Sequence, residues 1–370
     1  MAELVARERR RPGIQASPPW GDATGAHFTA QAGRCSPPDL AGAGMANADS
    51  AAAMVNQVAK RVVANVEQVV VGKRQSLLLA LTCWLSEGHI LLEDVPGVAK
   101  TVLARALARS LGGSFKRIQC TPDVLPSDIT GASVFNPQTV AFEFRPGPIF
   151  AQVVLADEIN RATPRTQSAL LEAMAEQHVT VDGTTHALES PFLVIATQNP
   201  IDHEGTFPLP EAQLDRFLMR FQLGYPTMEE ELKMLELLER EHPLNRLEPV
   251  ISPSDLIACQ QAVRTIRVDP KVRHYLLQLV HASRSHEDVA LGASPRGSIA
   301  LFRAAQAMAA IRGRDFVQPD DIKRIVLPVL SHRMILKPES RLRKVNATRV
   351  VEELIEETPV PLLANETRAT

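Results

Sequence analysis

The chain has 370 residues, of which 45% are hydrophobic and 22% are charged, and its formal net charge at pH 7 is −2. This composition is typical of a globular protein, and the length allows one large domain with a smaller one. A near-neutral chain lacks the basic excess of most nucleic-acid-binding proteins, and it contains no run of about 18 apolar residues to span a membrane. We therefore expect a cytoplasmic protein that neither binds nucleic acid nor crosses a membrane.

The first 48 residues differ in composition from the rest of the chain. They are rich in Pro, Gly and Ala and show no periodic apolar face. Such a segment cannot bury enough apolar surface to offset the entropy of ordering it, so we predict that residues 1–48 are a disordered extension. No apolar stretch follows its arginines, as a secretory signal would require, and translation could start at Met1 or at Met45.

Helices and short apolar strands alternate from Ala51 onward. Valines recur at helical spacing after Ala51, and a second helix is predicted at residues 76–86. Strands are predicted at residues 89–92, 115–119, 153–156, 192–197 and 217–223, with helices at residues 101–111 and 164–175. This alternation predicts an α/β fold, in which a parallel sheet is covered on both faces, over a domain of residues 52–225.

Two hairpins interrupt this alternation, and the strands then end. One hairpin is predicted at residues 132–144 and the other at residues 178–188, which turns on Asp182-Gly183. After Tyr225 only helices are predicted, at residues 229–240, 253–263, 270–284, 295–311 and 319–327. They would form an all-helical domain over residues 226–335, followed by a C-terminal helix and tail over residues 336–370.

The segment from Asp94 to Thr101 connects a predicted strand to a predicted helix. At such a junction, backbone N–H groups and the helix N-terminus can hold phosphate oxygens. Lys100 would reach the phosphates of a nucleotide, and the Thr101 hydroxyl would bind Mg²⁺. The usual pattern G-x-x-x-x-G-K-[ST] has glycines where this chain has Asp94 and Ala99, and only Gly97 remains. Taken alone, the segment fits an ordinary strand-to-helix turn equally well, and the Asp94 side chain would have to point away from the phosphates.

Two carboxylates and an amide follow later strands. Asp157 would bind Mg²⁺ at the end of one strand, where Glu158 would orient and deprotonate the attacking water. Asn199 follows the next strand, where it could contact the γ-phosphate or that water. Each feature also has a plain structural explanation, since acidic strand ends and turn-forming asparagines are common. Their position downstream of a phosphate loop favours a site for ATP and Mg²⁺.

Two arginines are candidates for contacts with phosphate. Arg216 begins the last predicted strand, where it would form a surface ion pair with Asp215 or act as an arginine finger on the ATP of a neighbouring subunit. Arg296 lies in the first turn of a helix that Ser294 and Pro295 open. A cation at that end of a helix is mildly unfavourable, which indicates that Arg296 serves an anion such as a γ-phosphate across the domain cleft.

The order of these motifs resembles that of the AAA+ ATPases, and closely that of the MoxR family, over about residues 52–335. The resemblance is carried by residues 93–101 (EDVPGVAKT), 144–150 (FRPGPIF), 155–162 (LADEINRA), 172–174 (EAM), 196–200 (ATQNP), 211–217 (EAQLDRF) and 294–296 (SPR). MoxR-like loops share the pattern Pro-Gly-x-Ala/Gly-Lys-Thr, so Asp94 and Ala99 are expected residues in this family.

The resemblance implies an AAA+ αβα nucleotide-binding domain with a C-terminal helical lid, and it assigns roles to individual residues. ATP would be bound by Val95, Pro96, Gly97, Val98, Ala99, Lys100 and Thr101, with Val71 and Gly72 lining the adenine. The Mg²⁺ ligands would be Thr101 and Asp157. The catalytic residues would be Glu158 as the base, Asn199 as the first sensor, Arg216 as the arginine finger and Arg296 as the second sensor. The hairpin at residues 178–188 would be the insert within helix 2 that faces the pore.

The resemblance also implies an assembly and a function. We expect a ring, and specifically a hexamer, with ATP between the subunits. Family members act as chaperone-like factors in the maturation of enzyme complexes or in metal insertion, usually with a von Willebrand factor A partner. We therefore expect an ATPase that remodels a protein complex.

The sequence leaves two alternatives to this function. One is a nucleic-acid motor of the branch that shares the insert, but residues 179–185 contain no Lys or Arg with which a hairpin would grip DNA. The other is an ATP-gated scaffold without hydrolysis, which the presence of Glu158 and Arg216 disfavours.

Overall fold

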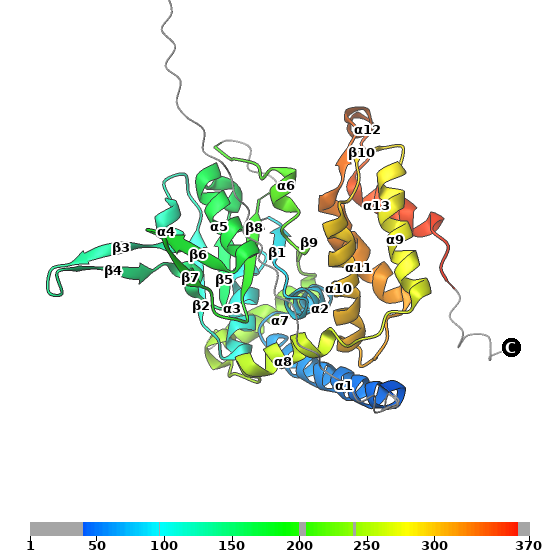
Figure 1. The fold of residues 1–370 in the computed structure, drawn as a ribbon, viewed down its shortest axis with the longest axis horizontal. Helices are drawn as coiled ribbons and strands as arrows, with labels where there is room; N and C mark the ends of the chain where they lie inside the picture. The colour runs from blue at the N-terminus through cyan, green and yellow to red at the C-terminus, as the bar shows by residue number, and fades with distance from the viewer. Residues whose placement is uncertain (1–39, 96, 200–204, 240–241, 362–370) are drawn as a thin grey trace, which may run out of the picture. The chain divides into compact units, whose positions relative to one another are not determined.

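The computed structural model describes residues 40–95, 97–199, 205–239 and 242–361. Their central element is a five-stranded sheet in the order β2-β5-β8-β1-β9, in which every neighbouring pair is parallel (Figure 1). The strands are β1 (Ile90–Glu93), β2 (Phe115–Gln119), β5 (Val153–Asp157), β8 (Leu193–Gln198) and β9 (Met219–Phe221). The predicted α/β fold with a parallel sheet is therefore confirmed.

The sheet separates two apolar cores, because successive side chains of a strand point to opposite faces. The helices that cover it include α2 (Arg74–Leu85), α3 (Lys100–Leu111) and α5 (Pro164–Glu176). On β5, Val153 and Leu155 pack with residues of α2 and α3, whereas Val154 and Ala156 pack with residues of α5. Burial on both faces explains why the strands appear in the sequence as short apolar runs.

The C-terminal part of the described chain is mostly helical. Its elements are α7 (Met228–Leu238), α8 (Pro253–Val263), α9 (Pro270–Ser285), α10 (Pro295–Ile311), α11 (Pro319–Leu330), the 3₁₀ turn η4 (Ser331–Arg333), α12 (Pro338–Leu342) and α13 (Ala347–Glu357). Ser252, Asp269 and Ser294 cap α8, α9 and α10, and each is followed by a proline at the first helical position. These local signals explain why the starts of these helices could be predicted from the sequence.

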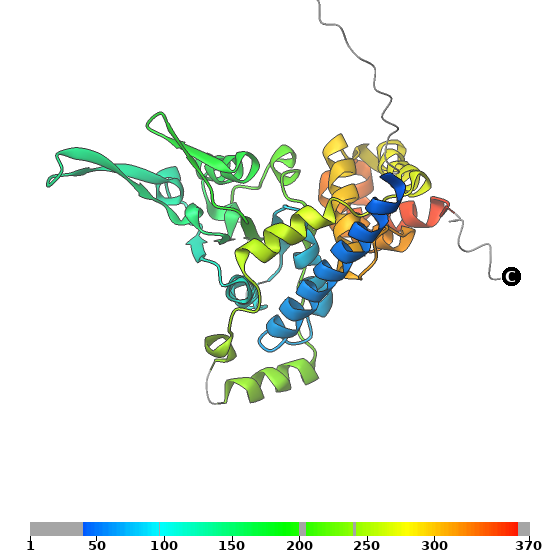
Figure 2. The same ribbon diagram turned by 60° about the horizontal axis from the view of Figure 1, so that its bottom comes forward.

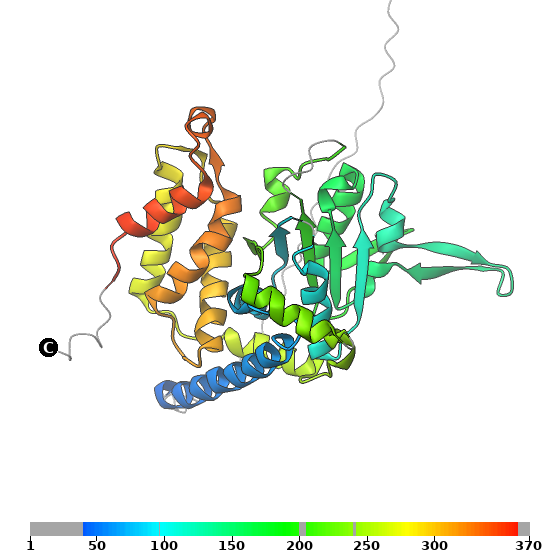
Figure 3. The same cartoon turned by 180° about the vertical axis from the view of Figure 1, so that it is seen from behind.

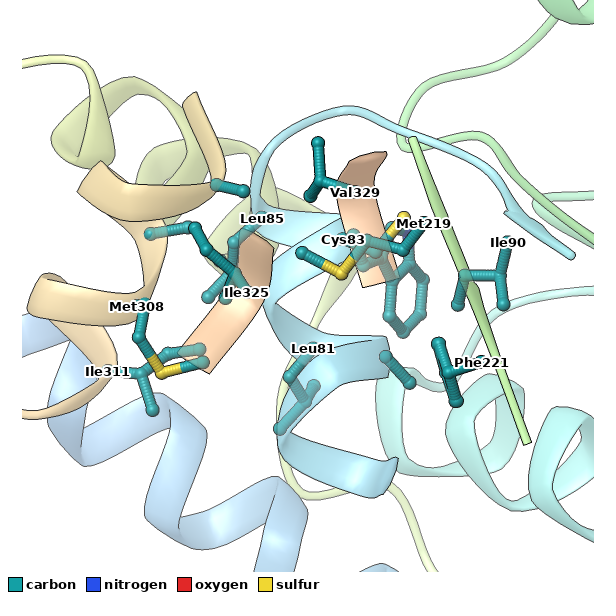
Figure 4. Packing of buried hydrophobic residues seen from close by; sticks show 14 of the residues in the cluster. Leu81, Cys83, Leu85, Ile90, Met219, Phe221, Met308, Ile311, Ile325 and Val329 are labelled. Carbon is teal, nitrogen blue, oxygen red and sulfur yellow. The ribbon is translucent and has the colours of Figure 1, made fainter. Parts of the chain in front are cut away.

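The helical part shares a core with one face of the sheet. Helices α9, α10, α11 and α13 pack against one another (Figure 3), and α10 also packs on α2. Figure 4 shows Ile325 and Val329 of α11 in the same cluster as Cys83 and Leu85 of α2 and Met219 of β9. The apolar contacts are thus continuous from the sheet into the helical part.

Helix α1 begins earlier than predicted. It spans Leu40–Val66, so residues 40–48, which were expected to be disordered, are helical. Alanine is the most frequent residue of residues 40–48 and has the highest helix propensity of all residues. This propensity explains why the helix begins before the valines that repeat at helical spacing. The predicted disorder of residues 1–39 lies outside the described residues.

A short antiparallel pair of strands lies within the helical part. It consists of β10 (Val289–Leu291) and β11 (Ile335–Leu336). The prediction that only helices follow Tyr225 is therefore wrong, because strands of two or three residues are too short to show a periodic pattern.

Both predicted hairpins are present, as β3 (Gly131–Asn136) with β4 (Ala141–Pro146) and as β6 (His178–Val181) with β7 (Thr184–Ala187). The β3–β4 hairpin extends away from the sheet (Figures 1 and 2). It lies between the helical turns α4 (Pro126–Thr130) and η1 (Pro148–Phe150), whereas β6–β7 follows the end of α5. The prediction that residues 178–188 form the insert within helix 2 is therefore wrong, because β3–β4 is the hairpin that interrupts a helical segment.

Residues beyond the predicted lid boundary at 335 also pack with the helical part. In α13, Val350, Val351 and Leu354 are buried, and the helix contacts α9 and α11. The division into domains at residues 225 and 335 stays a prediction. No helix among the described residues is long and apolar enough to cross a membrane.

Candidate functional site

The loop between β1 and α3 contains two residues with positive φ. Gly97 has a φ of 90°, and Ala99, which directly precedes α3, has a φ of 63°. Glycine adopts this left-handed conformation freely, whereas an alanine does so at a cost of about 1–2 kcal/mol. The turn presents the N-terminus of α3 at the end of β1, which is an arrangement that binds phosphate oxygens. Pro96 lies outside the described residues.

The Asp94 carboxylate points away from this turn. It is buried and accepts hydrogen bonds from the backbone N–H of Leu223 and, at 3.1 Å, from that of Gly224. The backbone carbonyl oxygen of Asp94 accepts a hydrogen bond from the Lys100 ammonium group at 2.8 Å. Asp94, which replaces the first glycine of the usual loop, therefore holds the segment after β9. Its carboxylate points away from the place expected for the phosphates, which it would otherwise repel.

A cavity of about 370 Å³ lies beside the N-terminus of α3. It is lined by Gly97, Ala99, Lys100, Thr101, Val102, Arg117, Gln119, Asp157, Glu158 and Asn199. These residues come from the loop before α3, from α3 itself, from β2 and from the ends of β5 and β8. They converge because the carboxyl ends of parallel strands meet at one edge of a sheet. The structure thus brings together the loop residues, both carboxylates and the amide that the sequence assigns to one site.

Thr197 of β8 connects the two carboxylate residues. Its hydroxyl donates a hydrogen bond to Asp157 Oδ1 at 2.5 Å and accepts one from the backbone N–H of Glu158 at 2.8 Å. Glu158 has a φ of 58°, so the chain turns sharply after β5 and the Glu158 side chain lines the cavity. Sequence reasoning missed Thr197, although its place two positions before Asn199 offered a signal.

Two further residues of the site come from β2, at the edge of the sheet. Arg117 donates two hydrogen bonds to Asp157 Oδ2, from Nη2 at 2.6 Å and from Nε at 3.1 Å. Gln119 donates one from Nε2 to Glu158 Oε2 at 3.1 Å. Sequence reasoning missed both, because their role depends on the register that pairs Gln119 with Asp157. The only signal in the sequence is that they alternate with the apolar Ile118.

Lys100 is half-buried beside these acidic groups. Burial lowers the pKa of its ammonium group, and the negative charges of Asp157, Asp94 and Glu158 oppose this shift. A half-buried cation at a helix N-terminus is suited to charge-assisted hydrogen bonds with phosphate oxygens.

The cavity also offers ligands for Mg²⁺. Thr101 and Asp157 supply the oxygen donors that this ion prefers. Among the described residues, no cluster of three or more His, Cys, Asp or Glu side chains could hold a metal ion by itself. Because Mg²⁺ is usually bound by one or two carboxylates together with substrate phosphates, these residues fit an Mg²⁺–nucleotide complex.

Other residues assigned to the nucleotide by the resemblance do not line this cavity. Val98 is buried in the core, so only its backbone atoms could contact a ligand, whereas the partly buried Val95 packs against that core. Val71 is also buried. Gly72 has a φ of 75°, and a Cβ atom there would come within 1.7 Å of Glu230 Oε1. The assignment of Val71 and Gly72 to the adenine stays a prediction.

Arg216 and Arg296 line a second cavity, of about 300 Å³, between the sheet and α10. Neither of them lines the cavity of Lys100. The structure therefore does not bring Arg296 to a γ-phosphate that Lys100 of the same chain would bind. Asp215, the ion-pair partner considered for Arg216, pairs with Arg333 instead, at 2.8 Å.

The sequence matches two family models. Residues 89–219 match the ATPase family associated with various cellular activities (AAA), and residues 281–354 match the AAA lid domain. The first match includes Lys100, Asp157, Glu158 and Asn199, and the second includes Arg296.

Similar proteins match most of the chain. The uncharacterised protein YeaC of Bacillus subtilis is 53% identical over 302 residues, which are 82% of this chain and 94% of that protein. A Mycobacterium tuberculosis protein named Chaperone MoxR1 is 40% identical over 311 residues, which are 82% of each chain. A crystal structure of a Cytophaga hutchinsonii protein proposed to be an ATPase has a TM-score of 0.81 and 36% identity, covering 87% of this chain and 100% of that one. The similarity therefore extends through both the sheet and the helical part.

Proposed function

Because the chain belongs to the MoxR family of AAA+ ATPases, we propose that it hydrolyses ATP with Mg²⁺ in the cavity of Lys100 and uses this reaction to remodel a protein complex. One observation carries the proposal. A loop lysine and hydroxyl, two carboxylates and an amide line one cavity at the carboxyl edge of a parallel sheet. These are the groups that phosphoryl transfer to water requires.

Each of these residues has a distinct role in the proposal. Lys100 and the N-terminus of α3 bind the phosphates of ATP. Thr101 and Asp157 would hold Mg²⁺, which supplies positive charge to the phosphate oxygens when it is bound. Glu158 orients the attacking water and accepts its proton, while Asn199 donates a hydrogen bond to the γ-phosphate or to that water.

The cavity of Lys100 is not lined by Arg216 or Arg296 of the same chain. Arg216 and Arg296 together line the cavity between the sheet and α10, so we assign them to the ATP of a neighbouring subunit, as arginine finger and second sensor. An arginine supplied by another chain stabilises the charge that develops on the transferred phosphoryl group. This arrangement needs a ring with an ATP at each contact between subunits, and we propose a hexamer.

The role in remodelling is inferred from relatives. One similar protein is named a chaperone, and we extend that role to this chain. The proposal includes a partner with a von Willebrand factor A domain and a cytoplasmic location. Neither hairpin favours a nucleic-acid motor, because residues 178–187 contain no Lys or Arg and residues 131–146 contain only Arg145.

Phosphate release by the purified full chain tests the proposed function. With MgATP, we expect a rate that rises more steeply than protein concentration, because each active site needs two subunits. Chelation of Mg²⁺ or the change Lys100→Ala should abolish release, and added DNA should leave it unchanged. Unchanged release by Lys100→Ala would overturn the site, and a several-fold stimulation by DNA would favour a nucleic-acid motor.

A further inference from the structure

The sheet and the helical part meet at a buried arginine. Arg333 of η4 has a side chain that is 2% exposed, and its Nε donates a hydrogen bond to Asp215 Oδ1 at 2.8 Å. Its Nη2 donates to the backbone carbonyl oxygen of Phe217 at 2.6 Å, and its Nη1 donates to that of Leu218 at 3.1 Å. The three acceptors lie on both sides of Arg216 in the sequence, so one guanidinium holds the segment that carries this residue.

Ser294 makes a second contact with the same carboxylate. Its hydroxyl donates a hydrogen bond to Asp215 Oδ2 at 3.0 Å and, as the cap of α10, accepts one from the backbone N–H of Arg296 at 3.2 Å. Groups of the helical part thus bind both oxygens of Asp215, since Arg333 binds Oδ1. Asp215 directly precedes Arg216 and Ser294 lies two positions before Arg296, and the two functional arginines are exposed and line one cavity.

We propose that Arg333 is a positioning residue that acts through Asp215. By fixing this carboxylate, it sets Arg216 and Arg296 in the arrangement that reaches the ATP of a neighbouring subunit. This inference rests on the proposed function, because it takes the two exposed arginines to act on that ATP. Arg333 also lines the cavity of Arg216 and Arg296, but its side chain is only 2% exposed and its guanidinium is bound to Asp215, so we assign it no contact with the nucleotide.

The chemistry of the cluster requires an arginine. A guanidinium donates hydrogen bonds in several directions of one plane, whereas the donors of a lysine all lie on one atom. His332 cannot take over this role, because its burial, the largest cause, lowers the pKa of its side chain well below the usual range. If Arg333 is replaced, the Asp215 carboxylate must find other donors, and the segment of Arg216 moves with it.

Arg314 offers a matched control inside the helical part. It donates hydrogen bonds to both carboxylate oxygens of Asp321, at 2.7 Å and 2.5 Å, and the Asp321 side chain is 0% exposed. This ion pair joins the segment before α11 to its first turn and makes no bond to Asp215. The change Arg314→Lys therefore replaces a guanidinium–carboxylate contact in the same way as Arg333→Lys and leaves the segment of Arg216 in place.

The first experiment compares the kinetics of Arg333→Lys and Arg314→Lys in the full chain. We expect Arg333→Lys to lower kcat at least about tenfold and to leave the KM for ATP nearly unchanged. Small misplacements of catalytic groups have effects of this size on the rate. Arg314→Lys should lower the unfolding temperature to a similar degree and leave kcat within about twofold. An equal loss of kcat in both variants would show that Arg333 only stabilises the fold and would overturn the proposal.

The second experiment mixes variants within one ring. Arg333→Lys keeps an intact cavity around Lys100, and Lys100→Ala keeps correctly placed arginines, so a mixture should recover activity above the sum of the two alone. A mixture of Arg216→Ala with Lys100→Ala should recover activity in the same way. If only the second mixture recovers, Arg333 affects its own cavity and the proposal fails. If neither recovers, the role of Arg216 in a neighbouring site, and with it that part of the proposed function, fails.

A pair of serine changes tests the same contact without a buried charge. Ser294→Ala and Ser252→Ala both remove a helix cap that precedes a proline, but only Ser294 donates to Asp215. Ser294→Ala should lower kcat by a few-fold more than Ser252→Ala, with the same recovery on mixing with Lys100→Ala. Equal kcat values in the two variants would count against the positioning of Arg296 through Asp215.

Discussion

The two cavities proposed to share one ATP are held together in different ways. The cavity of Lys100 is built from strand ends and one helix N-terminus, and its charged groups bind one another directly, as Arg117 does Asp157. The second cavity lies where the sheet meets the helical part, and contacts between the two hold the segments that carry Arg216 and Arg296. The Arg216 side chain itself donates a hydrogen bond to the backbone carbonyl oxygen of Leu171 in α5, at 2.6 Å. Nucleotide binding therefore depends on a local motif, whereas the placement of Arg216 and Arg296 depends on the packing of the helical part.

The change Arg216→Ala should show the largest effect and the clearest difference between the two cavities. We expect kcat to fall about 10³–10⁵-fold, as for other arginine fingers, while the affinity for ATP stays the same. Phosphate release and the binding of a fluorescent nucleotide measure the two quantities. Arg349→Ala, which removes a surface ion pair with Glu353, serves as the control. A parallel loss of affinity would mean that Arg216 acts on the ATP of its own chain.

The change Glu158→Gln tests the chemistry of the first cavity alone. It removes the proton acceptor but keeps the shape of the side chain, so turnover should fall about 10²–10⁴-fold while ATP stays bound. Single-turnover phosphate release and nucleotide retention after gel filtration measure these outcomes. Glu236→Gln, at an exposed position of α7, should change neither. Persistent turnover in Glu158→Gln would show that another group accepts the proton.

Features that depend on neighbouring residues could be predicted from the sequence. Ser252 and Ser294 each precede a proline and mark a helix start, and the apolar runs mark the buried strands. The loop that contains Lys100 and the carboxylates after β5 were identified because each is a contiguous motif with a fixed order. Their convergence on one cavity follows from the parallel sheet.

Features that depend on tertiary contacts could not be predicted in this way. Arg117 is a site residue only because β2 pairs with β5, so that its side chain reaches Asp157. Arg333 and Asp215 are 118 positions apart, and no local pattern connects them. The same distance explains why an ion pair between Arg216 and Asp215 stayed open as one interpretation of the sequence. The two residues are adjacent in the chain but bind different partners.

The change Thr197→Val tests how far the first cavity depends on its internal hydrogen bonds. Valine keeps the volume but leaves the Glu158 backbone N–H without its acceptor and Asp157 Oδ1 without its Thr197 donor. We expect turnover to fall about 10–100-fold, with a loss of about 1–3 kcal/mol in the free energy of unfolding. Thr82→Val is the matched control, because the buried Thr82 hydroxyl binds only a carbonyl oxygen of its own helix. Similar turnover in the two variants would remove Thr197 from the site.

The smallest effects concern the two positions at which the phosphate loop departs from the usual glycines. Asp94→Gly restores the usual residue but removes the acceptor for the backbone N–H groups of Leu223 and Gly224. We expect a loss of about 1–3 kcal/mol in the free energy of unfolding and no gain in ATP affinity. Thermal unfolding and nucleotide binding measure the two quantities. A neutral Asp94→Gly would show that the carboxylate does not hold the segment after β9.

Ala99→Gly restores the other glycine, and its effect should have the opposite sign. The residue has a φ of 63°, so glycine relieves a strain of about 1–2 kcal/mol, but the greater freedom of the unfolded chain offsets about 0.5–1 kcal/mol of this gain. The net stabilisation should be about 0.5 kcal/mol, visible as a small rise in the unfolding temperature. A decrease would mean that the Ala99 methyl group makes a contact worth more than the strain. Opposite signs at the two positions would show that each departure from the usual loop has its own local cause, one a buried hydrogen bond and the other only a tolerated strain.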